Sequence, residues 1–204
     1  MIRAWARRVE AEHLAWNVAT VAPYVPPGAR VLDVGSWDCK LGAALRDRGA
    51  RVTCVDVVDK NRTDVELRLM RGATLPVTGD ERFDVVQFLY VLHHAADDLA
   101  LLREARRVVA DDGRVLVAED RVETWGERWL TIAFHLWLLA FTFMGWKGTF
   151  KRQSAWRARF AQAGLTVERT VELGRSRRLF PKNVLYVLAP ATPPGSPETL
   201  APPG

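Results

Sequence analysis

The chain has 204 residues, 49% of them hydrophobic and 26% charged, and its formal net charge is +5. A chain of this size buries one sizeable core, so we expect one globular domain and exclude a fibrous or wholly disordered protein. The basic residues form no stripe interleaved with aromatic side chains, which argues against a nucleic-acid partner. Two cysteines without a Cys-x-x-Cys pair exclude a disulfide framework and a cysteine-based zinc site, and we predict no bound metal.

The two ends of the chain differ in character from its middle. The first residues carry several charges and no apolar run long enough for a signal peptide, so we expect the protein in the cytoplasm. A helix predicted at 1–22 and a linker to residue 28 should cap the domain that follows, which we place at 29–188. The proline-rich stretch 189–204 is expected to be a disordered tail.

Within the domain, apolar runs alternate with helical spacings along the chain. We predict strands at 30–34, 51–57, 65–70, 83–89, 114–118, 165–173 and 183–188, helices at 41–48, 99–109 and 154–163, and a turn at 111–113. Strands that alternate with helices at this spacing favour an α/β fold. We expect a doubly wound, Rossmann-like, mostly parallel seven-stranded sheet with helices on both faces.

The stretch VLDVGSWDCKLG at 31–42 is the most informative part of the sequence. It joins a buried strand, a glycine that permits a tight turn, and the start of a helix. Only Gly35 and Gly42 are present, so the loop has neither the three-glycine pattern of dinucleotide sites nor the lysine pattern of nucleoside triphosphate sites. A nucleoside ligand without a pyrophosphate group fits this loop better.

Polar residues at the carboxyl ends of the strands are candidate site residues, because ligands of doubly wound sheets bind there. Asp33 lies near the end of the first predicted strand, and Asp56 lies 21 positions beyond Gly35, at the end of the second. A carboxylate at about this separation accepts hydrogen bonds from ribose hydroxyls. Two carboxylates at one edge also favour a ligand that carries positive charge.

Several weak motifs follow one another in an order typical of one enzyme family. They are VLDVGSWDCKLG, VDVV at 55–58, TLPV at 74–77, FDVVQFLYVLHHA at 83–95, LLREARRVVADDGRVLVAED at 101–120 and WRARFAQAGL at 156–165. In order and spacing this series resembles class I S-adenosylmethionine-dependent methyltransferases, most closely the small-molecule branch that includes quinone-biosynthesis enzymes. The resemblance covers roughly residues 29–188. Trp37 and Cys39 depart from it, since the family has glycines at both positions.

The resemblance implies transfer of a methyl group from S-adenosylmethionine to a small acceptor. In the family, the loop after the first strand wraps the methionine and adenosine portions of the cofactor, and the acid after the second strand binds the ribose. Residues after the fourth strand line the site of methyl transfer. Carried onto this chain, the cofactor-binding residues are Asp33, Gly35, Ser36, Asp38, Asp56, Leu75, Leu89 and Tyr90.

Two histidines after the fourth predicted strand are candidates for a general base, because imidazole titrates near neutral pH. In this interpretation His94 and His93 are catalytic; in the alternative, each only hydrogen-bonds backbone at the strand end. Asp120, after the fifth strand, is a candidate substrate contact, and the N-cap of a helix that begins near Val122 is its alternative role.

The segment at about 122–150 is predicted to be an apolar helical insertion. Between Trp129 and Trp146, the only ionisable side chain is that of His135. Three structures fit this pattern: a buried or lid helix over the active site, an interfacial helix docked on lipid, and, with least support, a membrane span. Each places the segment against an apolar neighbour.

We therefore predict a small hydrophobic acceptor, with Trp129, Phe134 and Trp137 as substrate contacts, and peripheral membrane contact through 129–146. The departures at Trp37 and Cys39 leave a second function open. If they prevent binding of the methyl donor, the chain is a methyltransferase-fold protein without catalysis that serves as a binding or membrane-associated interaction module.

Overall fold

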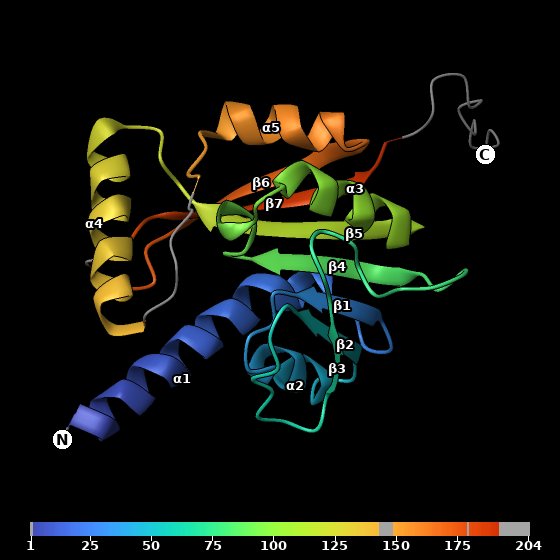
Figure 1. Cartoon of the computed structure of the whole chain (residues 1–204), viewed down its shortest axis with the longest axis horizontal. Helices are drawn as coiled ribbons and strands as arrows, with labels where there is room; N and C mark the ends of the chain where they lie inside the picture. The colour runs from blue at the N-terminus through green and yellow to red at the C-terminus, as the bar shows by residue number, and fades with distance from the viewer. Residues whose placement is uncertain (1, 143–148, 179, 192–204) are drawn as a thin grey trace, which may run out of the picture.

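The computed structural model describes residues 2–142, 149–178 and 180–191, with side chains placed from residue 7 to 137 in the first of these ranges (Figure 1). The predicted tail at 189–204 therefore lies outside the described residues from 192 on. The strands are β1 (Arg30–Val34), β2 (Arg51–Asp56), β3 (Glu66–Leu69), β4 (Phe83–Leu89), β5 (Val109–Asp120), β6 (Leu165–Gly174) and β7 (Asn183–Pro190). The helices are α1 (Ile2–Val21), α2 (Lys40–Arg46), α3 (Asp98–Val108), α4 (Trp125–Thr142) and α5 (Gln153–Gln162), with short 3-10 turns η1 (Ala22–Tyr24) and η2 (Leu92–His94).

The described strands form one seven-stranded sheet in the order β3-β2-β1-β4-β5-β7-β6. The first five strands in this order pair in parallel, and β7 runs antiparallel to both β5 and β6. This confirms the predicted fold class. Strand order reverses between β1 and β4, and ligand sites of doubly wound sheets form beyond the carboxyl ends of strands at such a reversal.

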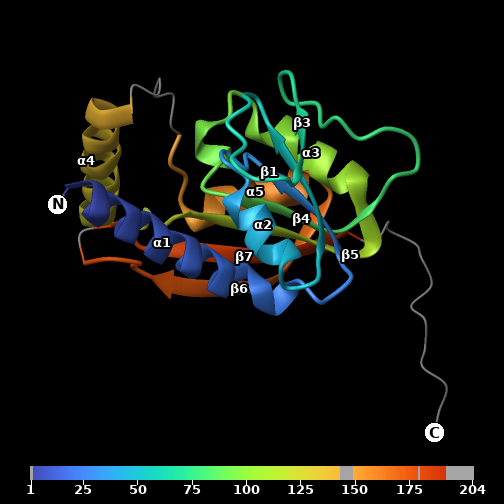
Figure 2. The same ribbon diagram turned by 90° about the horizontal axis from the view of Figure 1, so that it is seen from below.

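Side chains that alternate along the strands supply two apolar layers, one on each face of the sheet. Val31 packs with Leu45 of α2 and with the end of α1, whereas the next residue, Leu32, belongs to the cluster that contains Leu102 of α3 and Trp156 of α5. Figure 2 looks at the sheet from the side of α1 and α2, with α3 and α5 behind it. The core therefore consists of two layers, one on each face of the sheet.

The turn predicted at 111–113 is wrong, because β5 begins at Val109 and continues through these residues. Pairing with β4 passes from Phe83 opposite Val109 to Val85 opposite Arg114, so the intervening residues form a bulge within the strand. Gly113 permits this bulge, since a Cβ there would lie 2.9 Å from the carbonyl oxygen of Asp84.

The predicted apolar insertion contains α4, which stands beyond the carboxyl ends of the strands and apart from the two helix layers (Figure 1). A capping box starts this helix: Thr124 Oγ1 accepts the Glu127 N–H at 3.2 Å, and Glu127 Oε2 accepts the Thr124 N–H at 3.3 Å. Asp120 is therefore not the N-cap. The predicted span 129–146 lies outside the described residues from 143 on, and none of the described helices is long and apolar enough to cross a membrane.

Candidate functional site

The loop between β1 and α2 turns sharply at Gly35. Its φ is +76°, and its N–H donates to the Val55 carbonyl on β2 at 2.7 Å. A Cβ on this residue would lie 2.4 Å from Cγ2 of Val91, so only glycine lets the loop pass this close to the segment after β4. Ser36 follows, with its hydroxyl 3.4 Å from the same Val55 carbonyl. The turn therefore joins the ends of β1, β2 and β4.

Trp37 and Cys39 occupy this loop in the left-handed backbone region, with φ of 51° and 59°. Glycine adopts these torsions freely, so the backbone keeps a glycine-type path at a cost of about 1–2 kcal/mol per residue. The Trp37 ring is 42% exposed, with Nζ of Lys60 4.2 Å from its centroid, whereas Cys39 is fully buried against Cys54. Trp37 and Cys39 thus both take up a backbone conformation that glycine adopts more easily.

Backbone strain is concentrated at this edge of the sheet. Tyr90, directly after β4, is the third non-glycine residue with a positive φ (60°) in the described part of the chain, the other two being Trp37 and Cys39. Such residues persist where the surrounding structure determines the backbone strongly, and they cluster at functional sites. The strain supports placing a site between the ends of β1 and β4.

Asp56 ends β2 and binds the loop. Its Oδ2 accepts the Trp37 N–H at 2.8 Å, and its Oδ1 accepts the Val58 N–H at 3.2 Å. Asp38 instead turns toward α2, where its carboxylate accepts the Lys40 N–H at 3.2 Å and pairs with Nζ of Lys40 at 2.8 Å. Asp56 is thus positioned at the strand edge, and Asp38 stabilises the start of the helix.

Asp33 is a buried carboxyl group near the end of β1, only 3% exposed. Its Oδ1 accepts Nε2–H of Gln87 on β4 at 2.9 Å, while its Oδ2 has no hydrogen-bond partner in the described structure. Burial raises the pKa of Asp33 to about 6, and the nearby Asp56 charge adds to the shift. A buried carboxylate with a free oxygen is suited to neutralise a cationic ligand.

The Asp33 pKa predicts a pH-dependent cost to stability in the ligand-free protein. Its native pKa lies above the value of 3.8 for a free carboxyl, so the native state binds more protons between about pH 4 and pH 6. Stability falls as pH rises through this window, by about 3 kcal/mol in total. Asp33→Asn keeps an acceptor for Gln87, and urea unfolding should show its advantage over wild type growing across the window and then levelling off. Asp80→Asn, an exposed control, should show no such growth, and parallel curves for Asp33→Asn would contradict the prediction.

The remaining predicted cofactor residues lie at different depths. Leu75 is buried in the cluster under α3 and α5, and its N–H donates to Glu104 of α3 at 3.0 Å. Leu89 and Tyr90 are half-buried and pack on the opposite cluster. The Tyr90 ring lies 6.0 Å from that of His13 on α1, and burial raises the pKa of its hydroxyl. Leu89 and Tyr90 therefore lie at the carboxyl edge, and Leu75 lies deeper.

The turn η2 places His93 and His94 directly after β4. Glu119 near the end of β5 accepts the Leu92 N–H at 2.9 Å on Oε1 and Nδ1–H of His93 at 2.5 Å on Oε2. All three of these residues are at most 1% exposed. Burial favours the neutral imidazole, but the Glu119 carboxylate outweighs it and raises the pKa of His93. The His93 ring is therefore bonded by a carboxylate and not by backbone.

A third histidine reaches the same place from α4. Nδ1–H of His135 donates to the Thr131 carbonyl one turn earlier at 2.9 Å. The ring centroids of His93, His94 and His135, which we call the histidine cluster, lie 4.1, 5.2 and 5.8 Å apart, and the Phe150 ring packs 4.7 Å from that of His135. Burial lowers the pKa of His135, and it lowers that of His94 to about 4.

Asp120, at the end of β5, borders the histidine cluster. Its Oδ1 accepts Nδ2–H of Asn183 at 2.8 Å, and its Oδ2 lies 3.8 Å from Nε2 of His135. Burial raises the pKa of Asp120 to about 7, against the opposing charge of His93. The predicted substrate contact is thus brought close to the predicted base His93 and to His135 of α4.

The other predicted substrate contacts lie on different faces of α4. Phe134 is half-buried, with its ring 4.7 Å from that of Phe180, next to the histidine cluster. Trp129 and Trp137 are 62% and 50% exposed. Of the three, the structure brings only Phe134 toward the cluster from the inward side of the helix.

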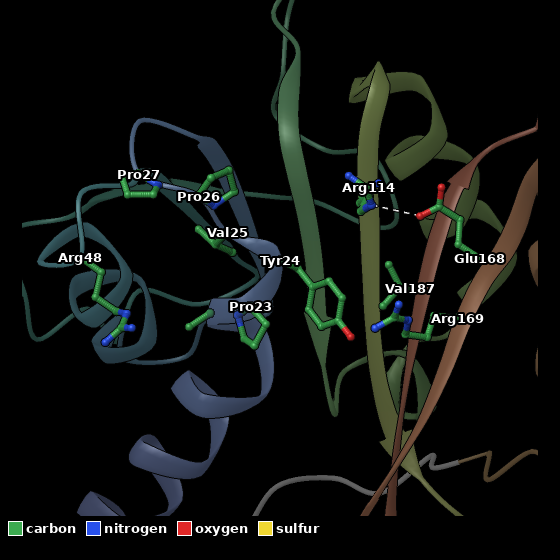
Figure 3. A pocket seen from close by; sticks show the side chains of 11 residues that line it. Pro23, Tyr24, Val25, Pro26, Pro27, Arg48, Arg114, Glu168, Arg169 and Val187 are labelled. Atoms are coloured by element: carbon green, nitrogen blue, oxygen red, sulfur yellow. Dashed lines mark hydrogen bonds and ion pairs between the residues drawn. The ribbon is translucent and has the colours of Figure 1, made fainter. Parts of the chain in front are cut away.

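A cavity of about 890 Å³ lies at the opposite, amino-terminal end of the sheet (Figure 3). Tyr24 projects into it from η1, and the Arg114–Glu168 ion pair closes its far wall. Four of its eleven lining residues are charged and the other seven are uncharged, and none of them is a predicted site residue. We place the functional site at the carboxyl edge, because strand-end carboxylates, backbone strain and the histidine cluster all lie there.

Sequence reasoning assigned no role to three residues of this site. Gln87 is a polar residue within an apolar strand, Glu119 stands beside the predicted Asp120, and His135 is the single ionisable residue of an apolar segment. Each of these exceptions to an apolar pattern is a sequence signal for a buried polar contact. Their partners, however, come from other elements and could not be read from the sequence.

Comparison with known proteins places this fold and sequence among methyltransferases. A family model described as a methyltransferase domain matches residues 5–170. The ubiquinone biosynthesis O-methyltransferases of Pseudomonas entomophila and of Pseudomonas fluorescens strain Pf0-1 are 33% and 32% identical to this chain over 99 residues. Each match spans 43% of this chain and 43% of the relative, so it covers less than half of either protein.

Solved structures share the fold over most of the chain. One belongs to a complex of the Haloferax volcanii Trm112 methyltransferase activator with a methyltransferase; it has a TM-score of 0.71 and 20% identity, and it covers 93% of this chain and 96% of that one. The mitomycin 7-O-methyltransferase MmcR has a TM-score of 0.64 and 22% identity, over 89% of this chain and 54% of its own. LepI, in complex with S-adenosylmethionine, has a TM-score of 0.60 and 16% identity, over 80% and 43%.

Proposed function

Since the chain belongs to the methyltransferase domain family, whose methyl donor is S-adenosylmethionine, we propose that it methylates a small hydrophobic acceptor at the carboxyl edge of its sheet. One observation carries the proposal: two groups of polar residues lie at that edge. Asp33 and Asp56 lie at the ends of β1 and β2, and the histidine cluster joins the turn after β4 to α4.

The residues beside the loop fit the donor. S-adenosylmethionine carries a positive sulfonium centre, and the unpartnered buried oxygen of Asp33 offers it a negative charge. Asp56 would accept the ribose hydroxyls, since each of its oxygens bonds one backbone N–H and retains a lone pair. The donor supplies an activated methyl group, while the protein supplies alignment and exclusion of water.

The acceptor side has a histidine suited to take up a proton. Glu119 fixes the His93 ring through Nδ1, and Nε2 is buried and without a partner in the described structure. A base oriented by a carboxylate in this way is a recurrent device for activating a hydroxyl. We assign His93 as the general base and place His94 beside it in the wall of the acceptor site.

The helix α4 supports the proposal of a hydrophobic acceptor. A normal surface helix turns its apolar side inward and its polar side to solvent, whereas α4 does the reverse. Its inward side presents Glu127, Thr131 and His135, all at most 8% exposed and spaced four positions apart. Its outward side presents large apolar side chains that are 50–72% exposed: Trp125, Trp129, Leu136 and Trp137.

We propose that this outward side docks on a lipid surface that holds the acceptor. Aromatic residues on one side of a helix with cations nearby are typical of interfacial helices. Arg128 and Arg152 line a cavity of about 230 Å³ together with Trp125, which could receive an anionic headgroup. An apolar acceptor dissolved in the lipid would then reach the histidine cluster from the inward side of α4.

Vesicle binding tests this docking. The double variant Trp125→Ser/Trp129→Ser should bind vesicles of phosphatidylglycerol and phosphatidylcholine at least about tenfold more weakly than wild type in co-sedimentation, because two indoles no longer enter the interface. Leu69→Ser removes a 55% exposed apolar side chain on β3 and should bind as wild type. If wild type ignores vesicles but forms dimers that the double variant lacks, the surface is a protein interface and the lipid proposal fails.

Titration with S-adenosylhomocysteine, the demethylated product of the donor, tests the methyltransferase function by calorimetry. Wild type should bind one molecule per chain. If no heat of binding appears although the protein is folded, the proposal fails. Vesicle binding in the absence of product binding would support the other function left open by the sequence, a membrane-associated interaction module without catalysis.

A further inference from the structure

We infer that the histidine cluster is a binding site for a divalent transition-metal ion, with Zn²⁺ as the expected ion and His93, His94 and His135 as its ligands. One nitrogen of each ring can be chosen so that all three lie within 4.8 Å of one another. Two of the ligands come from the turn after β4 and the third comes from α4. The methyltransferase function does not enter this inference.

The strongest support is the orientation of the rings. Histidines that bind a metal usually donate their other ring N–H to a carboxylate or a backbone carbonyl, which fixes the tautomer and aims the remaining nitrogen at the metal. His93 donates Nδ1–H to Glu119, and His135 donates Nδ1–H to a backbone carbonyl on α4. Both arrangements leave Nε2 as the free nitrogen.

The free nitrogen of His93 is buried and has no other partner among the described residues. His93 is 1% exposed, and its Nε2 is buried without a hydrogen-bond partner in the described structure. Leaving such a group unpaired costs about 1–3 kcal/mol, and a metal ion removes that cost. Oδ2 of Asp120 is likewise buried and unpartnered, 3.8 Å from Nε2 of His135, so negative charge is available beside the cluster.

The spacing needs only small rearrangements. Nitrogens bound to zinc at about 2.1 Å in a tetrahedral shell lie about 3.4 Å apart. The three nitrogens lie within 4.8 Å of one another, so they need to approach by at most about 1.5 Å, which side-chain rotation can supply. Three histidines leave the fourth position open for water, an acceptor oxygen or Asp120. Imidazole ligands favour zinc over magnesium, which prefers oxygen ligands.

A metal here would connect α4 to the end of the sheet, because His135 belongs to α4 and His93 and His94 follow β4. It would also change the role of His93, whose Nε2 would be a ligand and no longer a base. If the proposed function is correct, the ion would then take over activation of the acceptor hydroxyl as a Lewis acid. That consequence depends on the proposed function, whereas metal binding does not.

Titration of chelator-treated protein with Zn²⁺ and Co²⁺, without any methyl donor, tests the site. We expect one ion per chain by calorimetry and visible absorption bands of four- or five-coordinate Co²⁺. His94→Ala should weaken binding at least about 100-fold, and Glu119→Gln, which alters only the outer contact of His93, about 10–100-fold. Zn²⁺ should also raise the melting temperature of wild type.

The chain contains four histidines, and His13 on α1 is the one outside the cluster, so His13→Ala is the matched control. It should bind Zn²⁺ as wild type does. Circular dichroism shows whether each variant is folded, and His94, an exposed ligand, is the safest to replace. Absence of stoichiometric binding in folded wild type, or equal weakening in His13→Ala and His94→Ala, would overturn the inference. Metal binding without S-adenosylhomocysteine binding would support this site while refuting the proposed function.

Discussion

Asp56→Ala is expected to weaken S-adenosylhomocysteine binding by about 100-fold or more in calorimetry. The variant removes the carboxylate proposed to bind the ribose, and hydrogen bonds to a charged group contribute about 1.5–3 kcal/mol each. It also removes the acceptor for the Trp37 N–H, so the strained loop loses one of its contacts with β2. Both effects should weaken binding.

A conservative variant separates these two effects. Asp56→Asn keeps one oxygen that can accept the Trp37 N–H but lacks the negative charge, so its affinity should fall between those of wild type and Asp56→Ala. Asp80→Ala, which removes an exposed carboxylate in the loop before β4, is the control and should bind as wild type. Unchanged affinity in folded Asp56→Ala would show that this residue does not contact the ligand.

Glu119→Ala is expected to destabilise the protein by about 3–5 kcal/mol in urea unfolding. Both oxygens of this carboxylate are used inside the fold, one by the Leu92 N–H and one by the His93 ring. Removing one partner of a buried, charged contact leaves the other groups desolvated and unpaired, which is the costly case. The turn η2, which carries His93 and His94, should loosen first.

Two comparisons make this expectation specific. Glu119→Gln retains an acceptor for the Leu92 N–H and should lose less stability than Glu119→Ala. Glu168→Ala on β6 removes an exposed carboxylate that pairs with Arg114, and exposed pairs contribute at most about 1 kcal/mol. If Glu119→Ala were no less stable than Glu168→Ala, the buried pair would not hold η2 in place.

The sequence predicted the sheet well because its strands are continuous apolar runs, as expected for strands covered on both faces. Val31 and Leu32 illustrate this, since adjacent residues of β1 enter different core layers. The prediction failed at 111–113, where a local turn signal was read as the end of an element. In the structure these residues form a bulge within β5, because the strand stays paired with β4 on both sides of them. Such pairing involves residues distant in sequence, so a local pattern does not reveal it.

The candidate site divides in the same way. The position of Asp33, Gly35 and Asp56 at one edge of the sheet could be predicted from sequence, because parallel strands bring their carboxyl ends together. The conformation of Trp37 and Cys39 could not be predicted from the sequence, because it depends on left-handed torsions and on packing against Cys54 from another strand. The sequence also did not show which side of α4 faces inward, because a mostly apolar segment does not indicate its buried side until the helix is placed against the sheet.

The sequence by itself determined the alternation of strands and helices, the family resemblance and the strand-end carboxylates, because each depends on residues close together in the chain. Only the tertiary structure decided which groups meet. It placed Glu119 against His93. It also placed His135 of α4 beside His93 and His94, although His135 lies more than forty positions further along the chain. Such contacts depend on chain closure over long loops, for which local sequence carries no signal.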